Sequence, residues 1–254
     1  MRKEKIFLIL SVVLFAFQSC KNKQQKFETV VIESWHDADQ TVIKEKFEAK
    51  KTDFKKHGFY ELYDKSGNIK MKATYKDDEK NGRAEIFNED GSMRESAYFI
   101  NDKLNGTRQI LYASGSVEIE ENYVNDEYVG IYTKYFENGK ISEQGEYIEG
   151  AMQGMWKYFY KNGQLKEEVT FADNTENGPY KAYYENGNIK AIGQYKNEME
   201  DGLWKVYHAN GILQEEAEYK NGWEQGTIAV YDSTGKHIKN VTYENGRVKK
   251  YEEL

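Results

Sequence analysis

Cysteine, proline and histidine are scarce in this chain of 254 residues, and each scarcity excludes a kind of structure or site. Cys20 is the single cysteine, so no disulfide can form within the chain. Pro179 is the single proline, which leaves almost every backbone N–H free to join a β-sheet. The four histidines are scattered, and no serine or cysteine has an evident base partner. The sequence predicts no catalytic site, and we expect the protein not to be an enzyme.

A surplus of basic residues is also missing, because the formal net charge is −7. Nucleic-acid binding normally requires a basic patch, so we expect no nucleic-acid partner. Hydrophobic residues make up 39 % and charged residues 31 % of the chain, which is lean for a thick core. A sheet of one layer needs less interior, and the 21 tyrosines suit strands with half-hydrated faces.

Glycine, by contrast, is abundant and periodic. Eight glycines lie 24 residues apart: Gly58, Gly82, Gly106, Gly130, Gly154, Gly178, Gly202 and Gly226. We count each of them as place zero of one repeat, and number the eight repeats in chain order. A fixed period of this length indicates supersecondary units that stack to bury their apolar faces.

Three further places repeat with the glycines. Place five is large and apolar: Tyr63, Phe87, Leu111, Tyr135, Phe159, Tyr183, Tyr207 and Tyr231. Place nine is glycine: Gly67, Gly91, Gly115, Gly139, Gly163, Gly187, Gly211 and Gly235. Place seventeen is aromatic: Tyr75, Phe99, Tyr123, Tyr147, Phe171, Tyr195, Tyr219 and Tyr243. Place eleven is apolar in the first seven repeats, and the eighth has His237 there.

Each repeat is predicted to be a β-hairpin. Asn138-Gly139 is a strong hairpin-turn signal, and apolar and polar residues alternate after it. The alternation predicts that Ile141, Gly145 and Tyr147 lie on one face. No window outside the extreme N-terminus has a sustained helical period. The sequence therefore predicts an all-β protein of eight antiparallel hairpins in one elongated, twisted, single-layer sheet. Strands ~4.8 Å apart would make eight repeats roughly 75 Å long.

The turn type can be predicted from place twelve, which is mostly polar, and place eleven, which is apolar. A two-residue loop would pair place five with place twelve, whereas a three-residue loop with a glycine bulge would pair it with place eleven. We expect the bulged turn, with Tyr135 beside Ile141 on a buried face. Place three shares that face but is mostly polar, so we expect each first strand to bend or bulge before its aromatic residue.

The segment Gly154-Met155-Trp156-Lys157-Tyr158-Phe159-Tyr160-Lys161-Asn162-Gly163-Gln164-Leu165 resembles the bacterial variant of MORN repeats, the membrane occupation and recognition nexus. The resemblance extends over residues 58–246. It implies a string of antiparallel hairpins in one long twisted sheet. Bacterial chains of this kind are often labelled as antitoxins of toxin–antitoxin systems, so the resemblance implies that role as one possibility.

The two ends of the array are predicted to be caps. Trp35 and Phe47 are twelve residues apart, which is the spacing between places five and seventeen. We interpret residues 27–57 as a degenerate capping repeat, because a solenoid must protect its exposed strand edges. Residues 247–254 form a charged C-terminal tail that blunts the other edge.

The N-terminus resembles a lipoprotein signal. Arg2, Lys3 and Lys5 precede a twelve-residue apolar run, Ile6 to Phe17, which is too short for an ordinary membrane span. Cys20 follows this run, as in the lipobox of bacterial lipoproteins, where the thiol takes a diacylglyceryl group. The alternative is a plain signal peptide or an uncleaved anchor with an incidental cysteine.

We therefore expect residues 1–19 to be the signal peptide and residues 20–26 a lipidated tether. Cleavage would move the formal charge from −7 to −9, because the removed segment carries three basic residues and one acidic residue. The expected location is the cell envelope, lipid-anchored in the outer membrane and facing the periplasm or the surface.

Two rows of side chains are candidates for binding. Place two carries an aromatic residue in four consecutive repeats: Tyr132, Trp156, Tyr180 and Trp204. This stripe would suit glycan rings or protein side chains, or it is a structural ladder in which each ring covers small residues of the next hairpin. Place three carries Lys157, Lys181 and Lys205, a basic row for an anionic partner. The alternative for the row is cross-strand pairing with Glu167 and Glu215.

Metal and cofactor sites are not expected. His36, Asp37 and Asp39 are close in sequence but fall in the degenerate cap. The segment 173–184 departs from a calcium loop, because its third residue is Thr175 and its twelfth is Tyr184 where glutamate is needed.

Two functional classes remain open. One is a non-catalytic, lipid-anchored envelope scaffold that binds another protein or a cell-wall glycan. The other is an antitoxin or immunity protein that neutralises a dedicated toxin by occlusion. A signal peptide disfavours a cytoplasmic antitoxin but leaves a periplasmic immunity protein open.

Overall fold

The computed structural model of the protein describes residues 28–254, and all of the regular secondary structure in this range is β-strand. The strands of the first half are β1 (Thr29–Trp35), β2 (Ile43–Lys50), β3 (Lys56–Tyr63), β4 (Ile69–Lys76), β5 (Glu79–Phe87), β6 (Met93–Ile100), β7 (Lys103–Leu111), β8 (Val117–Val124), β9 (Glu127–Tyr128), β10 (Gly130–Tyr135) and β11 (Ile141–Ile148). The strands of the second half are β12 (Ala151–Phe159), β13 (Leu165–Ala172), β14 (Thr175–Tyr183), β15 (Ile189–Lys196), β16 (Met199–Glu200), β17 (Gly202–Tyr207), β18 (Leu213–Lys220), β19 (Trp223–Tyr231), β20 (His237–Glu244) and β21 (Arg247–Glu253).

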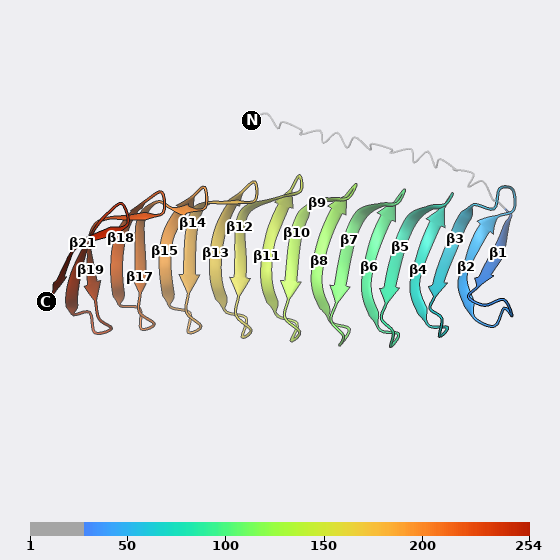
Figure 1. Ribbon diagram of the computed structural model, residues 1–254, viewed down its shortest axis with the longest axis horizontal. Helices are drawn as coiled ribbons and strands as arrows, with labels where there is room; N and C mark the ends of the chain where they lie inside the picture. Colours follow the sequence, from blue (N-terminus) through green and yellow to red (C-terminus); the bar gives the residue numbers. More distant parts are fainter. Residues whose placement is uncertain (1–27) are drawn as a thin grey trace, which may run out of the picture.

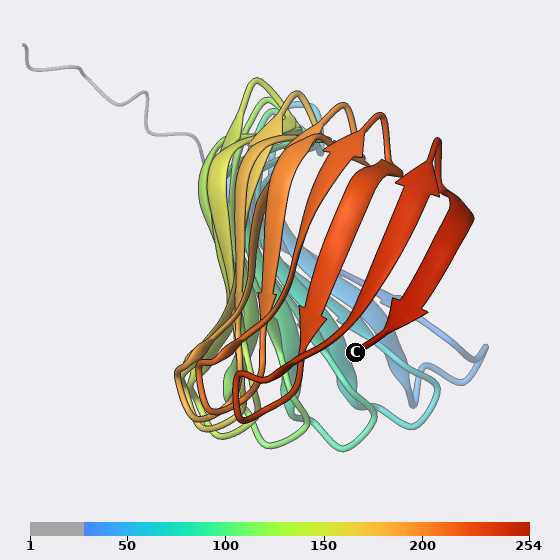
Figure 2. The same cartoon turned by 90° about the vertical axis from the view of Figure 1, so that its left-hand side faces the viewer.

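These strands form one open antiparallel sheet in which each pairs with the next along the chain, so the prediction of a single-layer array of hairpins is confirmed (Figure 1). At two places of the array a strand is split into two segments. β9 and β10 both pair with β8, and β16 and β17 both pair with β15. The described ends of the chain lie at opposite ends of the sheet, and Figure 2 shows the strong twist between them. The sheet does not close on itself.

The hairpin loop within each repeat has the bulged geometry predicted from places five and eleven. In the fourth repeat the Phe136 N–H donates to the Lys140 carbonyl and the Gly139 N–H donates to the Phe136 carbonyl, both at 2.8 Å. Gly139 has φ of +80° and Tyr135 pairs with Ile141. This is a type I turn closed by a glycine bulge, which requires a left-handed residue at place nine. These loops line the lower edge in Figure 1.

The predicted sharing of faces is wrong, because a bulge follows the hairpin loop in the second strand of each repeat. Lys134 pairs with Glu143 while Tyr135 pairs with Ile141, so one extra residue intervenes at place twelve. An extra residue reverses the alternation of side chains. Tyr135 and Ile141 consequently lie on the face opposite to Gly145 and Tyr147. A later repeat shows the same arrangement, where the place-five Tyr183 hydroxyl donates to Glu168 across the sheet at 2.9 Å.

A second kind of turn connects each repeat to the next, and it was not predicted from the sequence. Places nineteen and twenty both have positive φ, for example +53° at Asn125 and +73° at Asp126. Two adjacent left-handed residues make a two-residue type I′ turn, which asparagine, aspartate and glycine tolerate best. Such pairs follow every second strand of the array. These turns line the upper edge in Figure 1.

The invariant glycine at place zero relieves a local widening of the sheet. Ala73 pairs with Ala84 and Tyr75 with Lys80, so three residues of β5 face one residue of β4. Gly82 lies in this widening with φ of +125°, and a Cβ there would approach the Thr74 Cβ to 3.1 Å. A residue with a side chain would be strained by its backbone conformation and crowded by its neighbour.

The two faces of the sheet differ in how far they are filled. We call the face that carries places two, fifteen and seventeen the ring face, and the face that carries places one, three, fourteen and sixteen the open face. Nearly all of the buried hydrophobic side chains belong to the ring face: Tyr60, Ala73, Ala84, Ala97, Tyr123, Trp156, Val169, Ala182, Trp204, Ala217, Ile228 and Val241. The core is therefore a thin strip along one side of the sheet.

The ends of the array depart from the repeat pattern. The first hairpin has a longer loop, since Trp35 pairs with Ile43, eight residues on, where Tyr63 pairs with Ile69. Phe47 consequently lies opposite Tyr60 at the position of place fifteen, not of place seventeen as predicted. At the other end the charged residues form the exposed edge strand β21.

Candidate binding surfaces

The predicted aromatic stripe lies on the ring face, where its members pack in two pairs. The rings of Tyr132 and Trp156 are 5.6 Å apart, and those of Tyr180 and Trp204 are 5.2 Å apart. Each indole lies over a glycine of the preceding repeat. A Cβ at Gly145 would overlap the ring of Trp156, and a Cβ at Gly193 would overlap the ring of Trp204. Place fifteen is therefore glycine wherever place two of the next repeat is tryptophan.

The exposure of the stripe is uneven. Trp156 is fully buried and Trp204 nearly so, whereas Tyr132 and Tyr180 are half-buried. Burial, aided by Glu176, raises the pKa of the neighbouring Tyr195 to about 12. Trp156 offers no surface to a ligand in this conformation. A binding role for the stripe stays a prediction that would rest on its two tyrosines.

The third repeat places charged residues on the same ring face, and this was not predicted from the sequence. Arg108 occupies place two, and its guanidinium donates to Glu95 at 2.7 Å and to Glu121 at 2.5 Å. Glu121 is buried and also accepts from the Tyr123 hydroxyl at 2.8 Å. The hydrogen bond with Glu95 is the main cause of a raised Arg108 pKa. The sequence signal for this ion network is Arg108 itself, because place two is apolar or aromatic in the other seven repeats.

The open face exposes an apolar row at place one, which was not predicted from the sequence either. Ile131, Met155 and Leu203 are 51 %, 50 % and 46 % exposed, and Pro179 between the last two is exposed as well. They occupy the same register position in four consecutive repeats, so they follow a line along the sheet. Polar residues at place sixteen lie on the intervening strands, so the row has one apolar residue on every second strand.

The predicted lysine row flanks this apolar row, but its acidic partners are different ones. Lys157 lies 4.0 Å from Glu168 and Lys205 lies 2.8 Å from Glu216. The predicted partners Glu167 and Glu215 point to the ring face, because places thirteen and fourteen alternate. Between residues 28 and 254, Lys181 forms no ion pair, and it is exposed. The row therefore presents one unpaired cation between two weakly paired ones.

Residues weighed as metal ligands have structural roles in the turns. The His36 ring nitrogen lies 3.1 Å from the Tyr63 carbonyl, and Asp37 accepts from the Thr41 N–H at 2.8 Å. Asp173 and Asn174 form a two-residue turn, and the Asn174 side chain accepts from the Met152 N–H at 2.8 Å. Within the described part of the chain no group of three potential ligands could hold a metal ion.

Cys20, the predicted signal peptide and the predicted tether lie outside the described residues. Among residues 28–254 the structure contains no helix long and apolar enough to cross a membrane.

Comparison with known proteins assigns the family. Six segments of 22 residues match the MORN repeat variant: residues 56–77, 104–125, 128–149, 152–173, 176–197 and 200–221. The chain belongs to this family. The second and eighth repeats fall outside the matched MORN segments, although β5–β6 and β19–β20 pair as the other hairpins do. MORN repeats are consistent with a repeat scaffold of the binding type.

Other comparisons add little to the MORN assignment. No curated protein matches the chain. One solved structure with similarity is the pore of the Photorhabdus luminescens Tc holotoxin with the mutation TccC3-D651A, at 11 % identity and a TM-score of 0.24. The match covers 89 % of this chain but 15 % of that one, so this chain spans a small part of the protein it matches.

Proposed function

We propose that this protein is a non-catalytic, lipid-anchored scaffold of the cell envelope that binds a partner protein on the open face of its sheet. The observation that supports it best is the half-exposed row of Ile131, Met155, Pro179 and Leu203. Exposed apolar side chains gathered on one part of a surface and bordered by polar residues are typical of protein-binding surfaces. The anchor rests on Cys20, which follows the apolar N-terminal run.

The chemistry of the row indicates the kind of partner. Apolar residues at one register position repeat with the hairpins, so they suit an elongated apolar ridge on the partner. Lys157, Lys181 and Lys205 lie two residues further along the same strands and favour a partner with acidic groups beside that ridge. The ring face supports this surface from behind, because its buried indoles hold neighbouring hairpins in register.

A pull-down from the native envelope with the mature chain as bait tests the binding surface. The double variant Met155→Asp/Leu203→Asp should lose the captured partner, because it places two charges in the apolar row. Thr227→Asp is the control, since it introduces an aspartate at an exposed place one outside the row. Retention of the partner by the double variant would contradict the proposed surface.

The anchor is tested separately through Cys20→Ala. We expect the wild-type chain in the membrane fraction with an incorporated acyl label, and the variant without the label. An unlabelled wild-type chain would contradict lipid anchoring but would leave the binding surface to its own test.

A further inference from the structure

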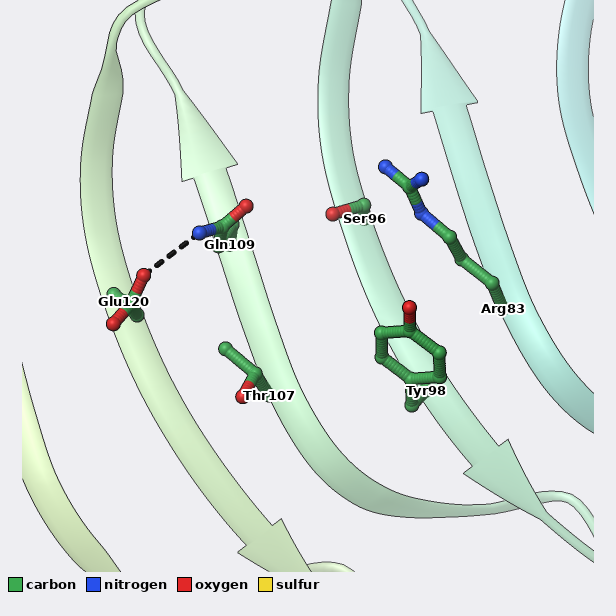
Figure 3. A pocket seen from close by; sticks show the side chains of 6 residues that line it. All are labelled: Arg83, Ser96, Tyr98, Thr107, Gln109 and Glu120. Atoms are coloured by element: carbon green, nitrogen blue, oxygen red, sulfur yellow. Dashed lines mark hydrogen bonds between the residues drawn. The ribbon is translucent and has the colours of Figure 1, made fainter.

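A second hollowed area lies on the open face at the other end of the sheet. A pocket of about 380 Å³ is lined by Arg83, Ser96, Tyr98, Thr107, Gln109 and Glu120 (Figure 3). These side chains come from four adjacent strands, β5 to β8, at places one, three, fourteen and sixteen. The pocket lies within the size range of small-ligand sites. It is independent of the apolar row and of the function proposed above.

Tyr98 is the aromatic platform of this pocket. It is 48 % exposed, and Figure 3 shows its ring lying across the strand with one face toward the viewer. Gly106 on the next strand makes room for it, since a Cβ there would lie 3.3 Å from the Tyr98 Cβ. Because this glycine carries no side chain that could cover the phenol, the exposed face of the ring is free to stack against a flat ligand.

The polar groups around the ring retain hydrogen-bonding capacity. The Gln109 amide N–H donates to Glu120 at 2.7 Å, which leaves the Gln109 carbonyl oxygen available. One guanidinium nitrogen of Arg83 lies 3.1 Å from a Glu85 carboxylate oxygen, and the other guanidinium N–H groups remain available as donors. Among the described residues the hydroxyls of Ser96 and Tyr98 form no side-chain hydrogen bond. Donors and acceptors are thus mixed around one exposed ring.

The same places make a second hollow one repeat earlier. A pocket of about 250 Å³ includes Phe59, Glu61, Lys72 and Thr74 and shares Arg83 with the first. Phe59 supplies an exposed ring at place one. Equivalent places recur ~10 Å apart, because each repeat adds two strands ~4.8 Å apart. That spacing is close to the length of a disaccharide unit.

We propose that these two adjoining hollows bind a linear oligosaccharide, with one pyranose ring stacked on Tyr98 and hydroxyls bonded by Arg83, Ser96 and Gln109. A sugar ring has an apolar face for the phenol and a rim of hydroxyls for the mixed donors and acceptors. An extended peptide is a poorer fit, because peptides join sheets at free edges, and β5 to β8 are paired on both sides.

Titration calorimetry of the full chain in detergent, with cellotetraose and with chitotetraose, tests the proposal. At least one probe should bind, and Tyr98→Ala should weaken it about tenfold. Tyr98→Phe should retain most of the affinity because it keeps the ring. Thr227→Ala, at an exposed place one outside both the hollows and the apolar row, should change nothing. Thermal unfolding checks that each variant is folded.

The contrary results are equally definite. Failure of both tetrasaccharides to bind would overturn the proposal, as would binding that survives both Tyr98→Ala and Arg83→Ala. Loss of a captured protein partner in Tyr98→Ala, with no sugar bound by the wild type, would assign the hollows to a peptide and would also overturn it.

Discussion

The third and fifth repeats fill the same position of the ring face, place two, with opposite kinds of side chain: a charged one in the third repeat and an aromatic one in the fifth. In the fifth repeat, Trp156 fills place two. Its indole occupies the space that a side chain on Gly145 of the preceding hairpin would need. In the third repeat, Arg108 fills place two and bridges Glu95 and Glu121. The backbone register is the same in both, with place two opposite place fifteen.

The difference shows that the hairpin frame does not dictate what fills the core. Bulged loops, two-residue turns and place-zero glycines set the backbone, and the ring face then accepts either apolar volume or a satisfied ion network. An indole over glycine contributes through buried area, whereas a buried ion network offsets its own desolvation and tolerates the loss of a member poorly.

The largest effect should come from Trp156→Ala, which removes a fully buried indole over a bare glycine. We expect the free energy of unfolding to fall by about 3–5 kcal/mol. Urea titration followed by circular dichroism measures it. Met155→Ala is the control, because Met155 is adjacent but half-exposed on the other face, and its change should stay within about 0.5 kcal/mol. Equal losses for the two variants would show that Trp156 is not a core residue.

Breaking the ion network should cost somewhat less. Arg108→Met leaves Glu95 and Glu121 without their cation, and we expect a loss of about 2–4 kcal/mol at neutral pH. The triple variant Arg108→Met/Glu95→Gln/Glu121→Met should recover most of the loss in the same titration. A triple variant as unstable as the single one would contradict a role for charge in this loss.

A side chain added at Gly145, under the indole of Trp156, tests the packing of the fifth repeat. Gly145→Ala places a methyl group in the Trp156 ring, and we expect it to cost about 1–3 kcal/mol. In the Trp156→Ala background the same change should cost much less, since the clash is gone. A double-mutant cycle measures this coupling. Additive effects would mean that the glycine serves its backbone and not the ring.

The smallest effect concerns Glu143, a carboxylate on the ring face between Lys134 and Tyr158. Burial raises the pKa of Glu143, and Lys134 offsets this in part. Because the folded-state pKa lies above the unfolded value, stability is lost as pH rises past the unfolded pKa. Glu143→Gln should therefore stabilise the protein at pH 7 by less than about 1 kcal/mol and have no effect below about pH 4. Stabilisation of equal size at both pH values would contradict this cause.

Much of the fold could be predicted because its determinants are local. Asn138-Gly139 with apolar Ile141 specifies a bulged turn, and the fixed period specifies a stack of such turns. The assignment of faces failed for a physical reason: one extra residue, Ser142, reverses the alternation beyond it. The displaced Phe47 has the same kind of cause, since a longer loop shifts the register of everything that follows.

The candidate sites were harder to predict because they depend on cross-strand neighbours. Place two was compatible with a binding stripe or with a structural ladder, and Gly145 and Gly193 admit the two indoles as a ladder would. The apolar row at place one and the hollow beside Tyr98 combine residues of several strands, each unremarkable in its own repeat. Turns such as Asn125-Asp126 could have been predicted from the sequence, because asparagine and aspartate tolerate the two adjacent left-handed conformations that this turn requires.

The nearest-neighbour meander also has a mechanical consequence. The strands cross the long axis, so their inter-strand hydrogen bonds run along it. A pull between the two ends therefore loads these bonds one strand at a time, as in peeling, and not all together, as in shear. Each released repeat of 24 residues would add about 80 Å of extended chain. Under tension the array should lengthen in repeat-sized steps while the remaining hairpins keep their structure.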